Sequence, residues 1–175
     1  MAIYVTSDAH GHVRALDEAL SKISLTSDDT LYVLGDMIDR GPDPVGVIKL
    51  VRSLPNTRVL KGNHEQIMLD AIIGQDPLDA ETWDINGGWT TREQLNDMEF
   101  EAYEELVRWM AALPLYAVAE TEERPYLLVH AGIEMKAARA FLLEHGVDCA
   151  GGVGAVGADR ELLQQMLAVQ SSDDL

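Results

Sequence analysis

The fold is decided by a stretch in the first third of the chain, TLYVLGDMIDRGPDPVGVIKLV (residues 30–51). An apolar run typical of a buried strand (30–34) leads into a polar turn, and apolar residues at helical spacing (44–54) follow the turn. The same order occurs twice more, with strands predicted at 2–7 and 57–61 and helices at 13–24 and 64–73. Three strand–loop–helix units in succession predict an α/β fold with a mostly parallel sheet.

The rest of the chain shows further elements but no internal repeat and no linker, so we expect one domain over residues 1–175. Residues 74–86 are rich in turn formers and acids, and we expect an exposed excursion there. Apolar spacing predicts a helix at 101–113, a hairpin with strands at 115–119 and 126–130, and helices at 136–145 and 160–169.

Composition and charge exclude several classes of protein. The 175 residues are 47% apolar and 25% charged, which is typical of a folded soluble protein. Acidic residues number 30 against 13 basic ones, for a net charge of −17, which disfavours binding to nucleic acid or to an anionic membrane. No apolar run is long enough to span a bilayer, and no basic region precedes the first strand. With a single cysteine, Cys149, the expected location is the reducing cytoplasm.

Four polar clusters, each beside a glycine, follow predicted strands. Their side chains are those of Asp8, His10, Asp36, Asp39, Arg40, Asn63, His64 and His130. The carboxyl ends of strands form the ligand crevice in open α/β sheets, so we expect the four clusters to converge. Taken singly, each residue is more often a turn former, an ion-pair partner or a structural histidine, but four such clusters together indicate a site.

The residue types in these clusters indicate a metal centre. Aspartate, histidine and asparagine without a thiolate favour Mn, Fe or Zn over Ca or Mg. A single ion would leave some of these candidate ligands unused, which favours two ions. A carboxylate such as Asp36 can bridge two ions about 3.5–4 Å apart. Two divalent ions with Asp8, Asp36 and a bridging hydroxide leave a slightly positive centre, which attracts phosphate even in an acidic protein.

The motifs Asp8-x-His10-Gly11, Gly35-Asp36-x-x-Asp39-Arg40-Gly41 and Gly62-Asn63-His64-Glu65 resemble the signature motifs of the calcineurin-like metallophosphoesterases. More narrowly, they resemble the bacterial and phage-type serine/threonine protein phosphatases. Val129-His130-Ala131-Gly132 is similar to the next metal-histidine motif of the family, and Asn86-Gly87-Gly88 followed by Thr90 resembles a segment of its bacterial members. The resemblance runs from about residue 3 to 133 and implies an αββα sandwich.

The resemblance also implies a role for each site residue. Asp8, His10 and Asp36 would hold a first divalent ion, and Asp36, Asn63 and His130 a second, with Mn expected and Fe or Zn as alternatives. His64 would protonate the leaving oxygen while paired with Asp39, and Arg40 would grip phosphate oxygens. Hydrolysis would proceed by attack of a metal-bridged hydroxide on a phosphomonoester, with no covalent intermediate.

Three functions stay open. Asp39 and Glu65 favour a protein phosphatase that acts on phosphorylated protein or small phosphoesters. Related proteins hydrolyse dinucleoside polyphosphates, which is the enzymatic alternative. The third is a domain that acts only by binding, because the family has a further histidine ligand downstream of His130. Here only His145 follows, in a stretch that we interpret as a helix end.

The lack of this further histidine leads us to expect a chain shortened at its C-terminus, with an incomplete second sheet. Exposed strand edges would then favour a homo-oligomer.

Two other sequence motifs carry less weight as evidence of function. Gly152–Gly157 matches a dinucleotide fingerprint but lacks the strand context, and Cys149 has no arginine at the spacing of cysteine-dependent phosphatases. We interpret the first as a glycine-rich loop and the second as a small apolar side chain.

Overall fold

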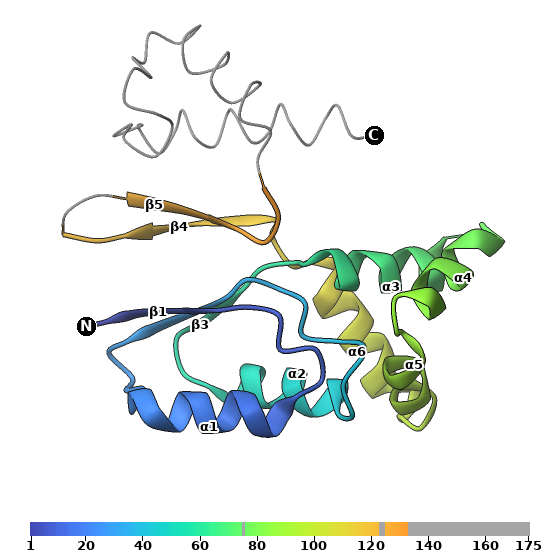
Figure 1. Cartoon of the computed structure of the whole chain (residues 1–175), viewed down its shortest axis with the longest axis horizontal. Coiled ribbons are helices and arrows are strands. Elements are labelled where there is room, and N and C mark those ends of the chain that lie inside the picture. The colour runs from blue at the N-terminus through green and yellow to red at the C-terminus, as the bar shows by residue number, and fades with distance from the viewer. Residues whose placement is uncertain (75, 123–124, 133–175) are drawn as a thin grey trace, which may run out of the picture. The chain divides into compact units, whose positions relative to one another are not determined.

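Figure 1 shows the chain as a computed structural model, which describes residues 1–74, 76–122 and 125–132. Its main sheet has three parallel strands in the order β1 (Ile3–Thr6), β2 (Thr30–Val33) and β3 (Thr57–Val59). The register pairs Ile3 with Thr30 and Leu31 with Thr57, so the carboxyl ends of the strands lie along one edge. The expected parallel α/β sheet is confirmed, and each strand is one or two residues shorter than predicted.

A helix follows each strand, as predicted. The helices are α1 (Val13–Ile23), α2 (Pro44–Ser53) and α3 (Asn63–Ile73). The start of α2 is fixed by Pro44 at its first turn and by the Asp43 carboxylate, which accepts a hydrogen bond from the Gly46 amide at 2.9 Å. In Figure 1, α1 and α2 lie side by side on one side of the sheet.

The core lies between the central strand and the helices. Leu31 and Val33 of β2 are each 1% exposed, because this strand is paired on both edges and covered by helices. The predicted helix over 101–113 is present as α6 (Phe100–Ala111). Apolar side chains of the helices complete the core: Leu16, Leu20, Val47, Ile48, Val51, Met68, Leu106 and Met110. This packing makes a rigid support for the loops at the carboxyl edge of the sheet.

The expected exposed excursion over 74–86 is wrong in part. A short helix, α4 (Pro77–Ile85), occupies most of this region, and a second short helix, α5 (Trp89–Asn96), follows it. Asp76 starts α4 by accepting a hydrogen bond from the Leu78 amide at 2.9 Å. Neither helix shows a clear apolar stripe, since Leu78 and Ile85 are exposed while Trp83 is buried. That irregular pattern is why the spacing of apolar residues did not predict them.

The predicted hairpin is present as β4 (Tyr116–Glu120) and β5 (Pro125–Val129), which form a second, two-stranded sheet within the described part of the chain. The chain divides into two compact units. The first, Met1–Ala117 with Leu128–Ala131, contains every residue predicted for the site. The hairpin residues 118–122 and 125–127 belong to the second unit.

Several predictions fall outside the described residues. They concern the helices at 136–145 and 160–169, the glycine-rich segment, His145 and Cys149. Of the helices that the structure describes, none combines the length and apolar character needed to cross a bilayer.

Candidate metal centre

Backbone hydrogen bonds tie the loop after β1 to the loop after β2. The Asp8 amide donates to the Gly35 carbonyl at 3.2 Å, and the His10 amide donates to the Asp36 carbonyl at 2.9 Å. The Gly11 amide extends the series to Met37 at 2.9 Å. The two loops therefore run beside each other beyond the sheet, as the carboxyl-edge argument predicted.

Glycine is required where the loops touch. A Cβ on Gly35 would lie 2.3 Å from the Gly62 nitrogen, and the φ of Gly35 is +104°. A Cβ on Gly41 would lie 2.0 Å from the His10 carbonyl oxygen. No side chain fits at such distances, so these glycines let three loops approach closely enough for their functional groups to meet.

Backbone strain is concentrated at the same place. Seven described non-glycine residues have positive φ, and five of them are predicted site residues. Their φ values are +57° for Asp8, +41° for His10, +53° for Asp36, +68° for Asp39 and +66° for Arg40. Such conformations cost on the order of 1–3 kcal/mol each and persist where the surrounding structure enforces them. Strain of this kind is typical of functional sites.

Two groups of metal-ligand side chains share one carboxylate. Ligand atoms of His10, Asp36 and His64 all lie within 4.8 Å of one another, and so do those of Asp8, Asp36 and His130. Asp36 Oδ2 is 3.7 Å from His10 Nε2 and 3.4 Å from His130 Nε2. A carboxylate common to two groups is the arrangement expected of a bridging ligand between two ions.

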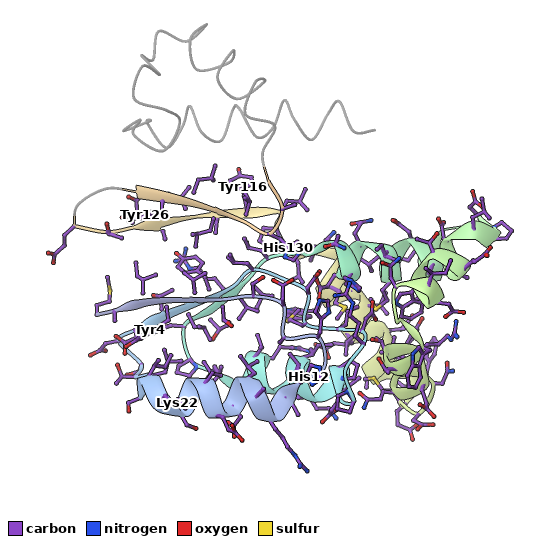
Figure 2. All side chains as sticks on the ribbon, viewed as in Figure 1. Tyr4, His12, Lys22, Tyr116, Tyr126 and His130 are labelled. Carbon is purple, nitrogen blue, oxygen red and sulfur yellow. The ribbon has the colours of Figure 1, made fainter. Side chains whose placement is uncertain are left out.

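The histidine tautomers fit metal binding. His10 Nδ1 lies 2.9 Å from the Ile38 carbonyl oxygen, which can only accept, so Nδ1 carries the proton and Nε2 presents a lone pair toward Asp36. His130 follows β5, and Figure 2 shows it close to the start of α3. Its Nε2 lies 2.9 Å from Asn63 Oδ1, so these two predicted ligands are adjacent. Nitrogen and oxygen donors of this kind suit Mn, Fe or Zn.

His64 is buried and lies at the centre of a hydrogen-bond chain that runs from Asp39 to Arg40. Its Nδ1 is 2.7 Å from Asp39 Oδ2, and both side chains are buried. Its Nε2 is 2.8 Å from Arg40 Nη2, while Arg40 Nη1 is 3.0 Å from His10 Nε2. A guanidinium only donates, so His64 Nε2 accepts and the His64 proton lies on Nδ1, directed at Asp39. The predicted pairing of His64 with Asp39 is present as a contact.

The geometry brings together every predicted site residue but groups two of them differently from the prediction. Asp8 lies with Asp36 and His130, whereas the family resemblance placed it with His10 and Asp36. His64, which the family resemblance assigned to proton transfer, also belongs by distance to the first ligand group. Arg40 bonds to the two histidines at the centre of the site. Asp8 is exposed, with 57% of its side chain accessible, and Arg40 and Asn63 are exposed as well, so this side of the site faces solvent.

Glu65 has a structural role that the sequence did not reveal. It is fully buried, and its carboxylate accepts hydrogen bonds at 2.8 Å from the amides of Asp36, Met37 and Gly62. Burial raises the pKa of the Glu65 carboxyl, while the three amide donors act in the opposite direction. One side chain thus joins the loops after β2 and β3. Its position three residues into α3 was the available signal, since that is where a glutamate reaches back to the helix start.

Replacing Glu65 by alanine should lower the free energy of unfolding by at least about 3 kcal/mol, because three buried amides lose their acceptor. Urea denaturation of the metal-free protein measures this directly. Glu93→Ala, on the exposed side of α5, is the matched control and should change stability by less than about 0.5 kcal/mol. Equal effects of the two substitutions would contradict the role given to Glu65.

Comparisons with known proteins show which family this chain resembles. Residues 1–157 match the family described as calcineurin-like phosphoesterase. A curated "Bis(5'-nucleosyl)-tetraphosphatase, symmetrical" from Erwinia tasmaniensis is 32% identical over 136 residues, which are 76% of this chain and 45% of that protein. A protein of the same name from Salmonella paratyphi C is 31% identical over 163 residues, or 89% and 50% of the two chains. The chain therefore spans about half the length of the curated relatives it matches.

A solved structure supports the fold. A protein serine/threonine phosphatase from Saccharomyces cerevisiae aligns with a TM-score of 0.54 at 17% sequence identity, over 79% of this chain and 43% of that one. At this level of identity, the likeness concerns the α/β fold.

Proposed function

Because the chain belongs to the calcineurin-like phosphoesterase family, we propose that it is a metal-dependent hydrolase whose substrates are dinucleoside polyphosphates. The observation that carries the hydrolase is the pair of ligand groups that share Asp36. The substrate class is supported by the two curated relatives, both named as symmetrical tetraphosphatases. This corrects the emphasis of the sequence interpretation, which put the protein phosphatase first and the dinucleoside polyphosphate hydrolase second.

The ligand side chains have distinct tasks in this proposal. Asp8, His10 and Asp36 would hold one divalent ion, and Asp36, Asn63 and His130 would hold the other. When bound, such an ion pair activates water and offsets the charge of a phosphoryl group. With its proton on Nδ1, His10 has a lone pair on Nε2, which Arg40 Nη1 contacts at 3.0 Å here and which an ion would take in place of that contact. Glu65 fixes the backbone on both sides of Asp36, so the shared carboxylate is held in place before a substrate arrives.

Arg40 and His64 act on the substrate. The planar guanidinium of Arg40 suits two oxygens of one phosphoryl group, and to reach them it exchanges its hydrogen bonds to the two histidines for bonds to phosphate. His64 Nε2 is then released toward the reacting group. Once Arg40 has moved away, His64 Nε2 takes up a proton from water, and the resulting imidazolium, stabilised by Asp39 through Nδ1, gives that proton to the leaving oxygen.

One observation favours a second candidate, the hydrolysis of phosphomonoesters such as phosphoserine. The buried pair of His64 and Asp39 is an arrangement that suits proton donation. A serine alkoxide is a poor leaving group and needs that proton, whereas a nucleoside diphosphate leaves with much of its charge already stabilised. The pair therefore fits a protein phosphatase as well as it fits the tetraphosphatase.

A comparison of the hydrolysis rates of two substrates tests the proposal. The full chain, supplied with manganese, is given diadenosine tetraphosphate and a phosphoserine peptide in separate assays at equal concentrations. We expect the higher kcat/KM on the tetraphosphate, with ADP as the sole nucleotide product, since symmetrical cleavage divides the tetraphosphate at its centre. Asp17→Asn, on the exposed face of α1, is the control and should leave both rates unchanged. A preference for the peptide would favour the second candidate, and no hydrolysis of either would contradict both.

A further inference from the structure

We propose that helices α4 and α5, with the turn between them, form a positioning element for catalysis. This element holds Asp39 and Arg40 in their working conformations. We call Trp83, Gly87 and Thr91 the α4–α5 brace. The inference rests on the proposed function in one respect: it takes His64 to be the proton donor of the hydrolytic reaction. None of the three residues touches the ligand groups, so they act through Asp39 and Arg40.

Two members of the brace bind the Asp39 carboxylate. The Trp83 indole nitrogen donates to Asp39 Oδ1 at 3.1 Å and Oδ2 at 3.2 Å, and the Thr91 hydroxyl donates to Oδ1 at 2.6 Å. Oδ2 also takes the bond from His64 Nδ1 at 2.7 Å. Asp39 and Thr91 are fully buried, and Trp83 is 3% exposed, so bulk water cannot replace these donors. The brace therefore fixes the plane of the carboxylate that faces His64.

The brace also holds the strained backbone beneath those side chains. Asp39 and Arg40 are consecutive residues with left-handed φ values of +68° and +66°. The Asp39 amide donates to Thr91 Oγ1 at 2.9 Å, and the Arg40 amide donates to the Gly87 carbonyl at 3.0 Å. Thr91 thus uses one hydroxyl twice, as an acceptor for the backbone and as a donor to the carboxylate. Two left-handed residues in succession need such external partners.

The local sequence is suited to this task more than to core packing. A Cβ on Gly88 would lie 2.2 Å from Trp83 Cδ1, so the turn can lie against the indole only with glycine there. The large apolar residues Leu78, Ile85 and Trp89 on the same two helices are 63%, 78% and 58% exposed. Helix α4 buries Trp83, and α5 buries Thr90, Thr91 and Leu95; of these four, Trp83 and Thr91 contact Asp39.

Loss of a brace donor has a specific chemical consequence. The Asp39 carboxylate can then rotate, and the His64 ring loses the partner that sets its orientation. The cost falls on proton transfer to the leaving oxygen, because the metal ligands keep their partners and Arg40 keeps its backbone hydrogen bond to Gly87. The rate should fall most for substrates with poor leaving groups, and KM should stay constant.

The experiment compares Trp83→Phe, which keeps the ring and removes the donor, with Thr91→Val, which keeps the shape and removes the hydroxyl. Each full-length variant is assayed with manganese on phenyl phosphate, a poor leaving group, and on p-nitrophenyl phosphate, a good one. We expect kcat to fall about tenfold on the first substrate and less than about threefold on the second. Thr91→Ser should restore most of the rate, and Trp109→Phe in α6 should behave like the wild type.

A second readout does not depend on turnover. The His64 Nδ1 proton, bonded to a buried carboxylate, should give a downfield proton NMR signal that exchanges slowly and disappears in His64→Asn. In the brace variants this signal should broaden or vanish. An unchanged signal, or equal losses on both aryl phosphates, would overturn the proposal. If the wild type shows the signal but hydrolyses neither the aryl esters nor diadenosine tetraphosphate, the proposed function fails while the NMR comparison still decides the role of the brace.

Discussion

Replacing Asp36 by asparagine is expected to abolish hydrolysis and to reduce the metal content of the chain. Asp36 is the one side chain common to both ligand groups, so its loss affects both ions. The amide would remove a negative charge and direct an NH₂ group toward His10 Nε2 and His130 Nε2, which now lie 3.7 and 3.4 Å from Asp36 Oδ2. Loss of the bridge should lower kcat at least about 10³-fold.

Metal analysis after dialysis and turnover of p-nitrophenyl phosphate measure the two effects. The fold should survive, because asparagine keeps the oxygen that accepts from the His64 amide at 3.0 Å. Asp70→Asn, on the exposed face of α3, is the matched control. A variant at position 36 that retained two ions per chain and a wild-type rate would rule out the bridging role.

The His64→Asn substitution is expected to have the second largest effect, and it separates two roles. As the proton donor, His64 should be worth about 10²–10⁴-fold in kcat on phenyl phosphate and far less on p-nitrophenyl phosphate. As a metal ligand, which its distance to His10 and Asp36 would allow, it should lower metal content and slow both substrates equally. Its bonds to Asp39 and Arg40 favour the first role.

The control for this prediction is the same substitution at an exposed histidine of the neighbouring loop, His12→Asn. It should leave both rates and the metal content unchanged, since asparagine is also favourable at the position before α1. A His64→Asn variant that hydrolysed phenyl phosphate at the normal rate would contradict the proton-donor role.

The sheet and the position of the site could be predicted from the sequence because they depend on local signals. Apolar runs such as residues 30–34 define buried strands, and glycine beside Asp36 marks a sharp turn at a strand end. The carboxyl-edge rule then brings residues distant in sequence, such as Asp8 and Asn63, to one place. Asp8 lies in one ligand group with Asp36 and His130, and Asn63 Oδ1 lies 2.9 Å from His130 Nε2, while the assignment of each to an ion stays a prediction.

Other parts of the site depend on partners that only the folded chain brings together. Glu65 binds backbone amides from another loop, and backbone amides carry no sequence signal. Trp83 and Thr91 lie 44 and 52 residues from Asp39, on helices without a clear apolar stripe. The motifs also did not decide between the two substrate classes, since Asp39 and Glu65 favoured the protein phosphatases while the curated relatives are named tetraphosphatases. The expected homo-oligomer and cytoplasmic location stay predictions.

A manganese titration of the metal-free full chain, followed by electron paramagnetic resonance, examines the shared carboxylate itself. Two ions bridged by Asp36 would lie about 3.5–4 Å apart and be magnetically coupled. We predict two manganese ions per chain at saturation, with the multiline spectrum of a coupled pair. One ion per chain, or two ions with the uncoupled six-line spectrum, would contradict a dinuclear centre built on Asp36.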